Sequence, residues 1–284
     1  MVKPASSRRK GIKKAHNFPR ISVILLGLIL LFCMFAELLM TKDPSYLDLE
    51  HLSEAPNGEF LFGTDSLGRD LFSGIWYGGR ISLAIGFLST LIAAGIAILY
   101  GTVSGLASKQ VDGLMMRLLE VFLSVPGLLL VLFLQAILGQ ANILSLSLVI
   151  GVTSWPSMAK VVRTEVQQLR NAEYILASTG MGCGFFHILF KHLIPGFFPS
   201  IGFMLVMTVR SAISWESTLS FMGMGLPLEV ISWGSMLSLA EKALLTESWW
   251  IIVIPGVFLV TVLLCLTNVG NYLSQSTHRK ESNL

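Results

Sequence analysis

The chain has 284 residues, of which 53% are hydrophobic and only 13% are charged, and its mean hydropathy is +0.71. Soluble domains carry about 25% charged residues. This shortage of charge excludes a disordered protein, a nucleic-acid binder with a basic face and an ordinary soluble enzyme. It predicts an all-α, polytopic membrane protein. The three cysteines are widely separated, so neither a disulfide framework nor a zinc site is indicated.

Six apolar stretches are long enough to cross a bilayer as helices. The first, residues 21–40, follows a basic segment and precedes no cleavage site, so it is predicted as a retained transmembrane helix rather than a signal peptide. The other five are expected near residues 81–107, 114–138, 143–159, 193–215 and 249–273. Helices are preferred over barrel strands because the runs are continuous and long. Pro126 is predicted to kink the third helix.

The charges between the spans predict their orientation. Residues 1–20 hold seven bases and no acid, whereas the segment 42–79 holds seven acids against Lys42 and Arg69. Because basic segments stay in the cytoplasm, the N-terminus is expected inside and the segment 42–79 outside. Five further spans fill a core at residues 80–274. They leave the basic segment 160–195 and the tail 275–284 inside, so both termini are predicted to be cytoplasmic.

The cytoplasmic segment between the fourth and fifth spans is long for a helix–helix connection. From residue 160 to 176 it alternates charged and apolar residues, which predicts a short amphipathic helix. Gly180, Gly182 and Gly184 then predict a turn, and Phe185 and Phe186 lead a second helix. Such an ordered element is expected to dock on a soluble partner. The alternative is a helix that merely reinforces the membrane interface.

This segment also resembles a known motif. The run Glu173-Tyr174-Ile175-Leu176-Ala177-Ser178, followed by Gly182 and Ile194-Pro195, is similar to the EAA loop of ABC importer permeases. In that family the loop docks into a groove of the cytosolic ATPase and transmits nucleotide-driven motion to the membrane helices. Leu176 stands where glutamate is common, and Ser178 replaces the second alanine. The residues to which the resemblance assigns ATPase coupling are Glu173, Tyr174, Ala177, Ser178, Gly182, Ile194 and Pro195.

Two further regions resemble one particular subunit type within this family. Residues 62–70 (FGTDSLGRD) with 79–83, and residues 219–225 with 232–237, are similar to the C-type subunit of dipeptide, oligopeptide and nickel permeases. The resemblance implies a type I ABC importer permease fold in the inner or plasma membrane of a bacterium or archaeon. It also implies three kinds of protein partner: a homologous B-type permease, two cytosolic ABC ATPase subunits and an extracytoplasmic substrate-binding protein.

The motifs of several enzymes are absent from the sequence. It contains no GxxxxGK[ST] loop, no HExxH and no GxSxG. We therefore expect a non-catalytic subunit that binds no cofactor of its own, with ATP and Mg bound by the partner ATPases. We expect no catalytic residue, no metal site and no nucleic-acid partner. An intramembrane enzyme is disfavoured, because the sequence contains no recognisable set of catalytic residues.

Ionisable residues near the spans are candidates for function because their burial in hydrocarbon is costly. Arg210 lies in the fifth span. It is expected either to reach the lipid headgroups or to face a translocation path, where it would attract an anionic group or pair with a partner's acid. Glu216, expected at the start of the following outer loop, is a second candidate for the path. Arg117 and Glu120 are expected to form an i,i+3 ion pair.

The sequence therefore predicts a permease subunit of an ATP-driven importer of di- or oligopeptides, which forms half of the translocation path and couples to a cytosolic ATPase. Import of nickel or another metal–chelator complex by the same machinery is the alternative cargo. A membrane scaffold or receptor that recruits a cytosolic partner without transport is the alternative of another class.

Overall fold

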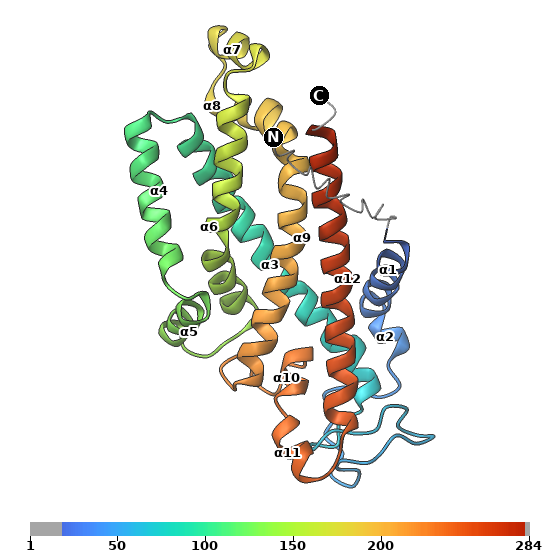
Figure 1. Ribbon diagram of the computed structural model, residues 1–284. Helices are drawn as coiled ribbons and strands as arrows, with labels where there is room; N and C mark the ends of the chain where they lie inside the picture. The colour runs from blue at the N-terminus through green and yellow to red at the C-terminus, as the bar shows by residue number, and fades with distance from the viewer. Residues whose placement is uncertain (1–18, 282–284) are drawn as a thin grey trace, which may run out of the picture.

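The computed structural model describes residues 19–281, and every regular element in this range is helical. The parts of the two predicted cytoplasmic tails at residues 1–18 and 282–284 lie outside it. The longest helices form an elongated bundle (Figure 1) and are α3 (Leu71–Leu106), α6 (Ile143–Leu169), α9 (Ile194–Phe221) and α12 (Trp250–Glu281). The other elements are α1 (Arg20–Met34), α2 (Ala36–Leu39), α4 (Lys109–Ser124), α5 (Gly127–Leu138), α7 (Glu173–Gly180), α8 (Phe185–Ile188), the π-helical turn η1 (Leu189–Leu193), α10 (Trp233–Leu237) and α11 (Ala240–Leu245).

The packing of α3 against α6 is the most extensive between any two helices. Glycines on α3 allow the close approach, because a Cβ atom on Gly101 would lie 2.7 Å from the Cβ of Val162. A Cβ on Gly105 would likewise lie 2.8 Å from the Cβ of Val166. Real Cβ atoms do not approach other atoms this closely, so the bundle depends on small residues at this crossing, as membrane helix pairs often do.

Four helices are long and apolar enough to cross a membrane, or five if the bent pair α4–α5 counts as one span, within the part of the chain that the structure describes. The first predicted span is shorter than expected. Helix α1 has 15 residues, about 22 Å of helix against about 30 Å of hydrocarbon, and a turn at Phe35 separates it from α2. Arg80 of α3 donates to the Met34 carbonyl at 3.2 Å, where α1 ends.

The third predicted span is broken rather than kinked. Helices α4 and α5 meet at Val125–Pro126 with a bend of 86°. Proline cannot donate a backbone hydrogen bond and disfavours a helical residue before it, so the prediction that Pro126 disturbs this helix is confirmed in a stronger form. The prediction of an Arg117–Glu120 ion pair is wrong, because Glu120 Oε1 instead lies 3.9 Å from Lys160 Nζ of α6.

Three helix boundaries differ from the predictions. Helix α3 begins at Leu71, well before residue 81, because the Asp70 side chain accepts a hydrogen bond from Ser73 N and caps the helix. Helix α6 continues to Leu169, so residues 160–169 extend a long helix and do not start a separate amphipathic one. The cause is the packing of its valines on the glycines of α3. Helix α9 continues to Phe221, which places Glu216 in a helix and not in a loop.

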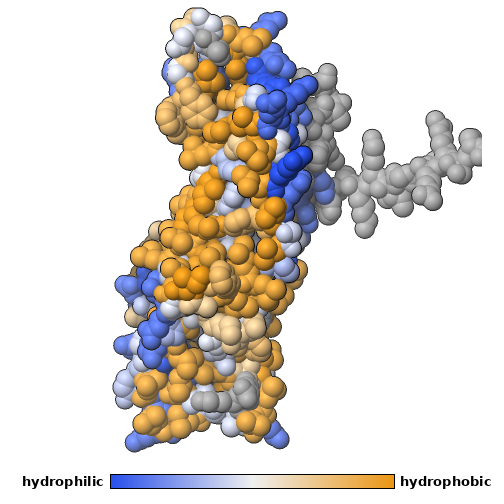
Figure 2. Space-filling model, turned by 90° about the vertical axis from the view of Figure 1, so that its left-hand side faces the viewer, coloured by the Kyte–Doolittle hydropathy of each residue, from blue (hydrophilic) through white to orange (hydrophobic). Residues whose placement is uncertain are grey.

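The two ends of the bundle differ. In Figure 1, α7 projects at the end toward which α12 finishes, and the segment 41–70, α10 and α11 lie at the opposite end. Figure 2 shows a face covered mainly by hydrophobic residues through its middle, with hydrophilic patches toward its ends. Exposed apolar residues on α4 and α5 include Leu114, Leu118, Val121, Leu129 and Phe133. Such a wide apolar surface is expected of helices that face lipid or another membrane subunit.

Candidate functional site

The segment between α6 and α9 forms a small helical hairpin. Helix α7 is followed by a turn in which Gly182 has φ +78° and Cys183 N donates to Ser178 O at 3.1 Å. A positive φ favours glycine, so the predicted need for glycine in this turn is confirmed at Gly182. Ile175 is buried in a cluster with Leu189 and Leu193, which holds the hairpin on the end of the bundle.

The outer side of this hairpin is apolar and exposed. Met181 is 76% exposed and Phe186 is 65% exposed, and Leu176 and Phe190 are also exposed. Leu176 belongs to α7, which projects at one end of the molecule, clear of the long helices (Figure 1). A projecting, exposed apolar surface of this kind indicates a protein–protein contact.

The predicted coupling residues divide between this hairpin and the start of α9. Glu173, Tyr174 and Ala177 lie exposed on α7, and Gly182 lies exposed in the turn. Ser178 is buried. The remaining two are Ile194 and Pro195, the first residues of α9, of which Ile194 is partly buried and Pro195 is exposed.

A contact that sequence reasoning missed joins α7 to η1. His192 Nε2 lies 3.2 Å from Ser178 Oγ, and the His192 ring lies 5.8 Å from the Tyr174 ring, between centroids. Ser178 Oγ also donates its single proton to Tyr174 O at 2.8 Å. The imidazole N–H must therefore be the donor to Ser178 Oγ. This explains the serine at position 178, because an alanine there could not accept the bond.

A second missed cluster ties the end of α6 to the last turn of α3 and the first turn of α4. Asp112 accepts hydrogen bonds from the Nε and Nη2 atoms of Arg163, from Ser104 Oγ at 2.6 Å and from Gln167 Nε2 at 3.2 Å. The bidentate pair of Asp112 with Arg163 is a strong, directional form of ion pair. Arg170 Nη1 adds a bond to Gly105 O at 3.2 Å. The last turns of α6 are therefore held firmly on α3 and α4.

A cavity of about 290 Å³ opens between the α4–α5 elbow, α6 and α9. Its lining combines hydroxyl groups with methionine and aromatic side chains: Leu123, Gly127, Val131, Thr153, Ser154, Pro156, Ser157, Phe203, Met204, Met207, Thr208, Ser211 and Trp215. None of these is charged. Methionine side chains adapt to varied shapes, and hydroxyl groups can both donate and accept hydrogen bonds. The cavity can therefore contact a polar but variable ligand.

The two candidate path residues have different surroundings. Arg210 lies on α9, is partly buried, and its Nε atom is buried without a hydrogen-bond partner. It does not line the 290 Å³ cavity, although Ser211 beside it does. Glu216 is 0% exposed, so the structure corrects its expected position in an outer loop to the interior of the protein.

The carboxyl group of Glu216 accepts hydrogen bonds from four serine hydroxyls. Oε1 accepts from Ser232 Oγ at 2.6 Å and from Ser220 Oγ at 3.1 Å. Oε2 accepts from Ser82 Oγ at 3.2 Å and from Ser217 Oγ at 3.3 Å. These bonds connect α3, α9 and the start of α10. A buried carboxyl group needs such partners, so this geometry supports a packing role and not contact with a substrate.

Three of these hydroxyls also accept backbone N–H groups, which belong to Leu226, Trp233 and Ser235. Each of these three serines thus connects Glu216 to a backbone N–H group of residues 222–239, which we call the outer segment. The position of the outer segment after α9 is therefore determined by a group within α9.

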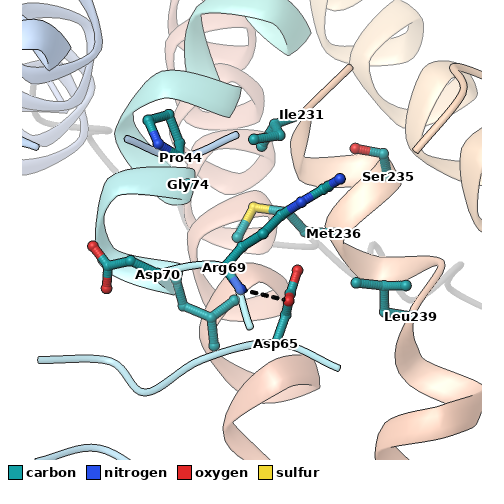
Figure 3. Close-up of a pocket in the computed structure, with 10 residues that line it drawn as sticks. Pro44, Asp65, Arg69, Asp70, Gly74, Ile231, Ser235, Met236 and Leu239 are labelled. Carbon is teal, nitrogen blue, oxygen red and sulfur yellow. Dashed lines mark hydrogen bonds between the residues drawn. The ribbon is translucent and has the colours of Figure 1, made fainter. Parts of the chain in front are cut away.

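The segment 62–70, which carries part of the resemblance, forms a compact outer turn. Asp65 Oδ1 accepts from Leu67 N and Arg69 N, and burial raises the pKa of this carboxyl group, against the effect of these bonds. Arg69 lies across a pocket of about 10 Å³, large enough for one water molecule, and extends toward Ser235, while Asp70 points away from Asp65 (Figure 3). Arg69 Nη1 donates to Leu228 O at 2.7 Å, so this turn also holds the outer segment after α9.

No group of three or more His, Cys, Asp or Glu side chains is placed to hold a metal ion, as far as residues 19–281 are concerned. The geometry combines apolar helices long enough to span a membrane, a projecting hairpin with an exposed apolar side, and an uncharged cavity between helices. These features define a membrane permease subunit.

The comparisons with known proteins agree with this class. Residues 97–279 match the model of the family described as "Binding-protein-dependent transport system inner membrane component". The chain belongs to this family.

Several relatives carry names of peptide transport. The oligopeptide transport system permease protein OppC of Bacillus subtilis (strain 168) is 33% identical over 94% of this chain and 87% of its own length. The dipeptide transport system permease protein DppC of the same strain is 36% identical over 79% of this chain and 70% of its own length. A solved structure of the MetNI methionine ABC transporter, in inward-facing conformations, matches with a TM-score of 0.54 and 17% identity, over 72% of this chain and 95% of that chain. This last likeness concerns the fold.

Proposed function

We propose that the chain is the C-type permease subunit of an ATP-driven importer of di- or oligopeptides. The names of the relatives support the class of cargo. The observation that carries the role of this subunit is the projecting α7–α8 hairpin with its exposed apolar side, because a surface of this kind needs a protein partner.

In this proposal the chain crosses the membrane six times, and both termini are cytoplasmic. Helices α1 and α2 together form the first crossing, and the bent pair α4–α5 forms the third. Helices α3, α6, α9 and α12 supply the other four. The distribution of charge supports this orientation, since the basic segment around α7 and the acidic segment 41–70 lie at opposite ends of the bundle.

The proposed partners are a homologous B-type permease, two cytosolic ABC ATPases that bind ATP and Mg, and an extracytoplasmic substrate-binding protein. ATP binding closes the ATPases and moves the α7–α8 hairpin, and hydrolysis resets it. This chain contributes half of the wall of the path and one coupling joint. Its 290 Å³ cavity suits peptides, because uncharged hydroxyl and methionine side chains do not select for the charge of the cargo.

The test is reconstitution of the full complex in proteoliposomes with its binding protein and labelled peptides. We expect ATP-dependent peptide uptake, and ATP hydrolysis that is stimulated by the loaded binding protein. Deletion of residues 170–184 is expected to abolish both. Uptake of a nickel chelate without peptide uptake would contradict the proposed cargo, and stimulation that survives the deletion would contradict the proposed coupling.

Arg210 is proposed as a path residue because its Nε atom is buried and has no partner. We expect Arg210→Ala to assemble normally and to lower the uptake of peptides severalfold. Arg20→Ala, a matched change at an exposed arginine at the start of α1, is expected to leave uptake unchanged. Unchanged uptake by the Arg210 variant would refute this role.

A further inference from the structure

The two helices that flank the coupling hairpin are anchored unequally. On one side, α6 is fixed by Asp112, which binds Arg163 and Gln167, and by its close packing on the glycines of α3. On the other side, α8 leads into η1 and α9 without a comparable ion pair among the described residues. A movement of α7 that is resisted by α6 must therefore pass toward α9.

The connection to α9 has an unusual backbone. In η1 the bond from Ile194 N goes to Leu189 O, five residues back, instead of the usual four. Single π-helical turns of this kind are rare and occur frequently at functional sites. The turn stands between the coupling hairpin and α9, and α9 carries Arg210 and part of the wall of the 290 Å³ cavity.

His192 is the side chain that joins this turn to α7. Its imidazole donates to Ser178 Oγ, and its ring lies against Tyr174. Ser178 Oγ is held in place by its own bond to Tyr174 O, so the acceptor is oriented before His192 binds it. The contact is partly shielded from water, since Ser178 is buried and His192 is partly buried. A movement of α7 therefore displaces His192, and with it the π-helical turn.

We propose that His192 is a positioning residue that transmits the movement of α7 to α9 through η1. This inference rests on the proposed function, because it names the route by which the coupling hairpin reaches the transport path. It assigns no contact with ATP, substrate or ATPase to His192. The Ser178–His192 hydrogen bond is the element whose loss uncouples hydrolysis from transport.

The experiment compares variants of the full complex in proteoliposomes and measures peptide uptake per ATP hydrolysed. His192→Phe keeps a ring against Tyr174 but removes the donor, and we expect about threefold to tenfold less uptake per ATP. His192→Gln restores an N–H donor and is expected to recover most of the ratio. His51→Phe is the control for the loss of a histidine, because His51 belongs to the segment 41–70, which lies at the opposite end of the bundle from α7. We expect it to behave as wild type.

A double variant makes the test specific to the hydrogen bond. Ser178→Ala is expected to lower the ratio as His192→Phe does, and the combination is expected to be no worse than either single change. A ratio for His192→Phe equal to that of wild type would overturn the proposal. So would loss of the ATPases from the purified His192→Phe complex, which would show a docking role instead.

Measuring uptake and ATP hydrolysis separately distinguishes an error in the cargo from an error in the role of His192. If the wild-type complex takes up no peptide, the proposed cargo is wrong. The effect of His192→Phe is then measured on the ratio of ATP hydrolysis with and without the binding protein. An unchanged ratio in that assay would overturn the role of His192 as well.

Discussion

Replacing Glu216 with alanine removes the carboxyl group on which four buried serine hydroxyls converge. A hydrogen bond to a charged group contributes about 1.5–3 kcal/mol, but the four contributions are not additive because a freed hydroxyl can turn to another acceptor. Leaving a buried donor without its acceptor costs about 1–3 kcal/mol, and truncation of the side chain also leaves a cavity, so together the expected cost is about 3–5 kcal/mol. We expect a loss of this size in the free energy of unfolding.

Glu216→Gln tests the reasoning further. The amide keeps one acceptor oxygen and turns an NH₂ group toward hydroxyls that need an acceptor, so the expected loss is about 1–3 kcal/mol. Glu229→Ala is the matched control. Glu229 is an exposed acid of the adjacent outer segment, and its loss is expected to change stability by less than about 0.5 kcal/mol.

The assay uses the cysteines of the chain as reporters. Cys33 and Cys265 are buried, so a thiol-reactive dye labels them when the protein unfolds in denaturant and mixed micelles. Cys183 is less buried and is replaced by serine in every variant. If Glu216→Ala is as stable as the Glu229→Ala control, the four hydrogen bonds do not stabilise the outer end of the bundle and the reasoning is refuted.

Three further predictions concern the two ends of the molecule. Asp112→Asn removes the negative charge and one of the two acceptor oxygens opposite Arg163, so it is expected to lower the free energy of unfolding by about 2–4 kcal/mol in the same assay; an unchanged value would contradict the anchoring of α6. The hydrogen bond to Asp48 raises the pKa of His51, because the protonated imidazole is favoured beside the carboxylate. The Asp48–His51 contact therefore stabilises the folded protein fully below about pH 6.5, and this stabilisation is lost as the pH rises through the raised pKa. Between pH 5.5 and 8.5, the free energy of unfolding should decrease with rising pH in wild type more than in His51→Gln. Equal pH dependence in the two proteins would contradict a stabilising Asp48–His51 contact. Gly68→Ala puts a Cβ 1.8 Å from Asp48 O at φ +79°, so we expect loss of the outer turn, seen as faster proteolysis of the segment 41–70 than in wild type.

The helical class and the approximate positions of the long helices could be predicted from the sequence, because both follow from local composition. A long apolar run must satisfy its own backbone hydrogen bonds in a membrane, and a helix does so without any partner. Pro126 and Gly182 were also predictable, since each acts on its own backbone. The motif at residues 173–178 indicated the position of the hairpin, and the structure describes a helix there.

The tertiary structure alone decided which side chains meet. Asp112 and Arg163 are 51 residues apart, and Ser82 and Glu216 are 134 residues apart. Such pairs depend on how each helix is rotated about its axis and where it crosses its neighbour, and hydropathy carries little information about either. For this reason Glu216 was expected in a loop, although four serines surround it inside the protein. The same reason hid the contact of His192 with Ser178: the two residues face each other only because the chain reverses at Gly182 and the π-helical turn follows.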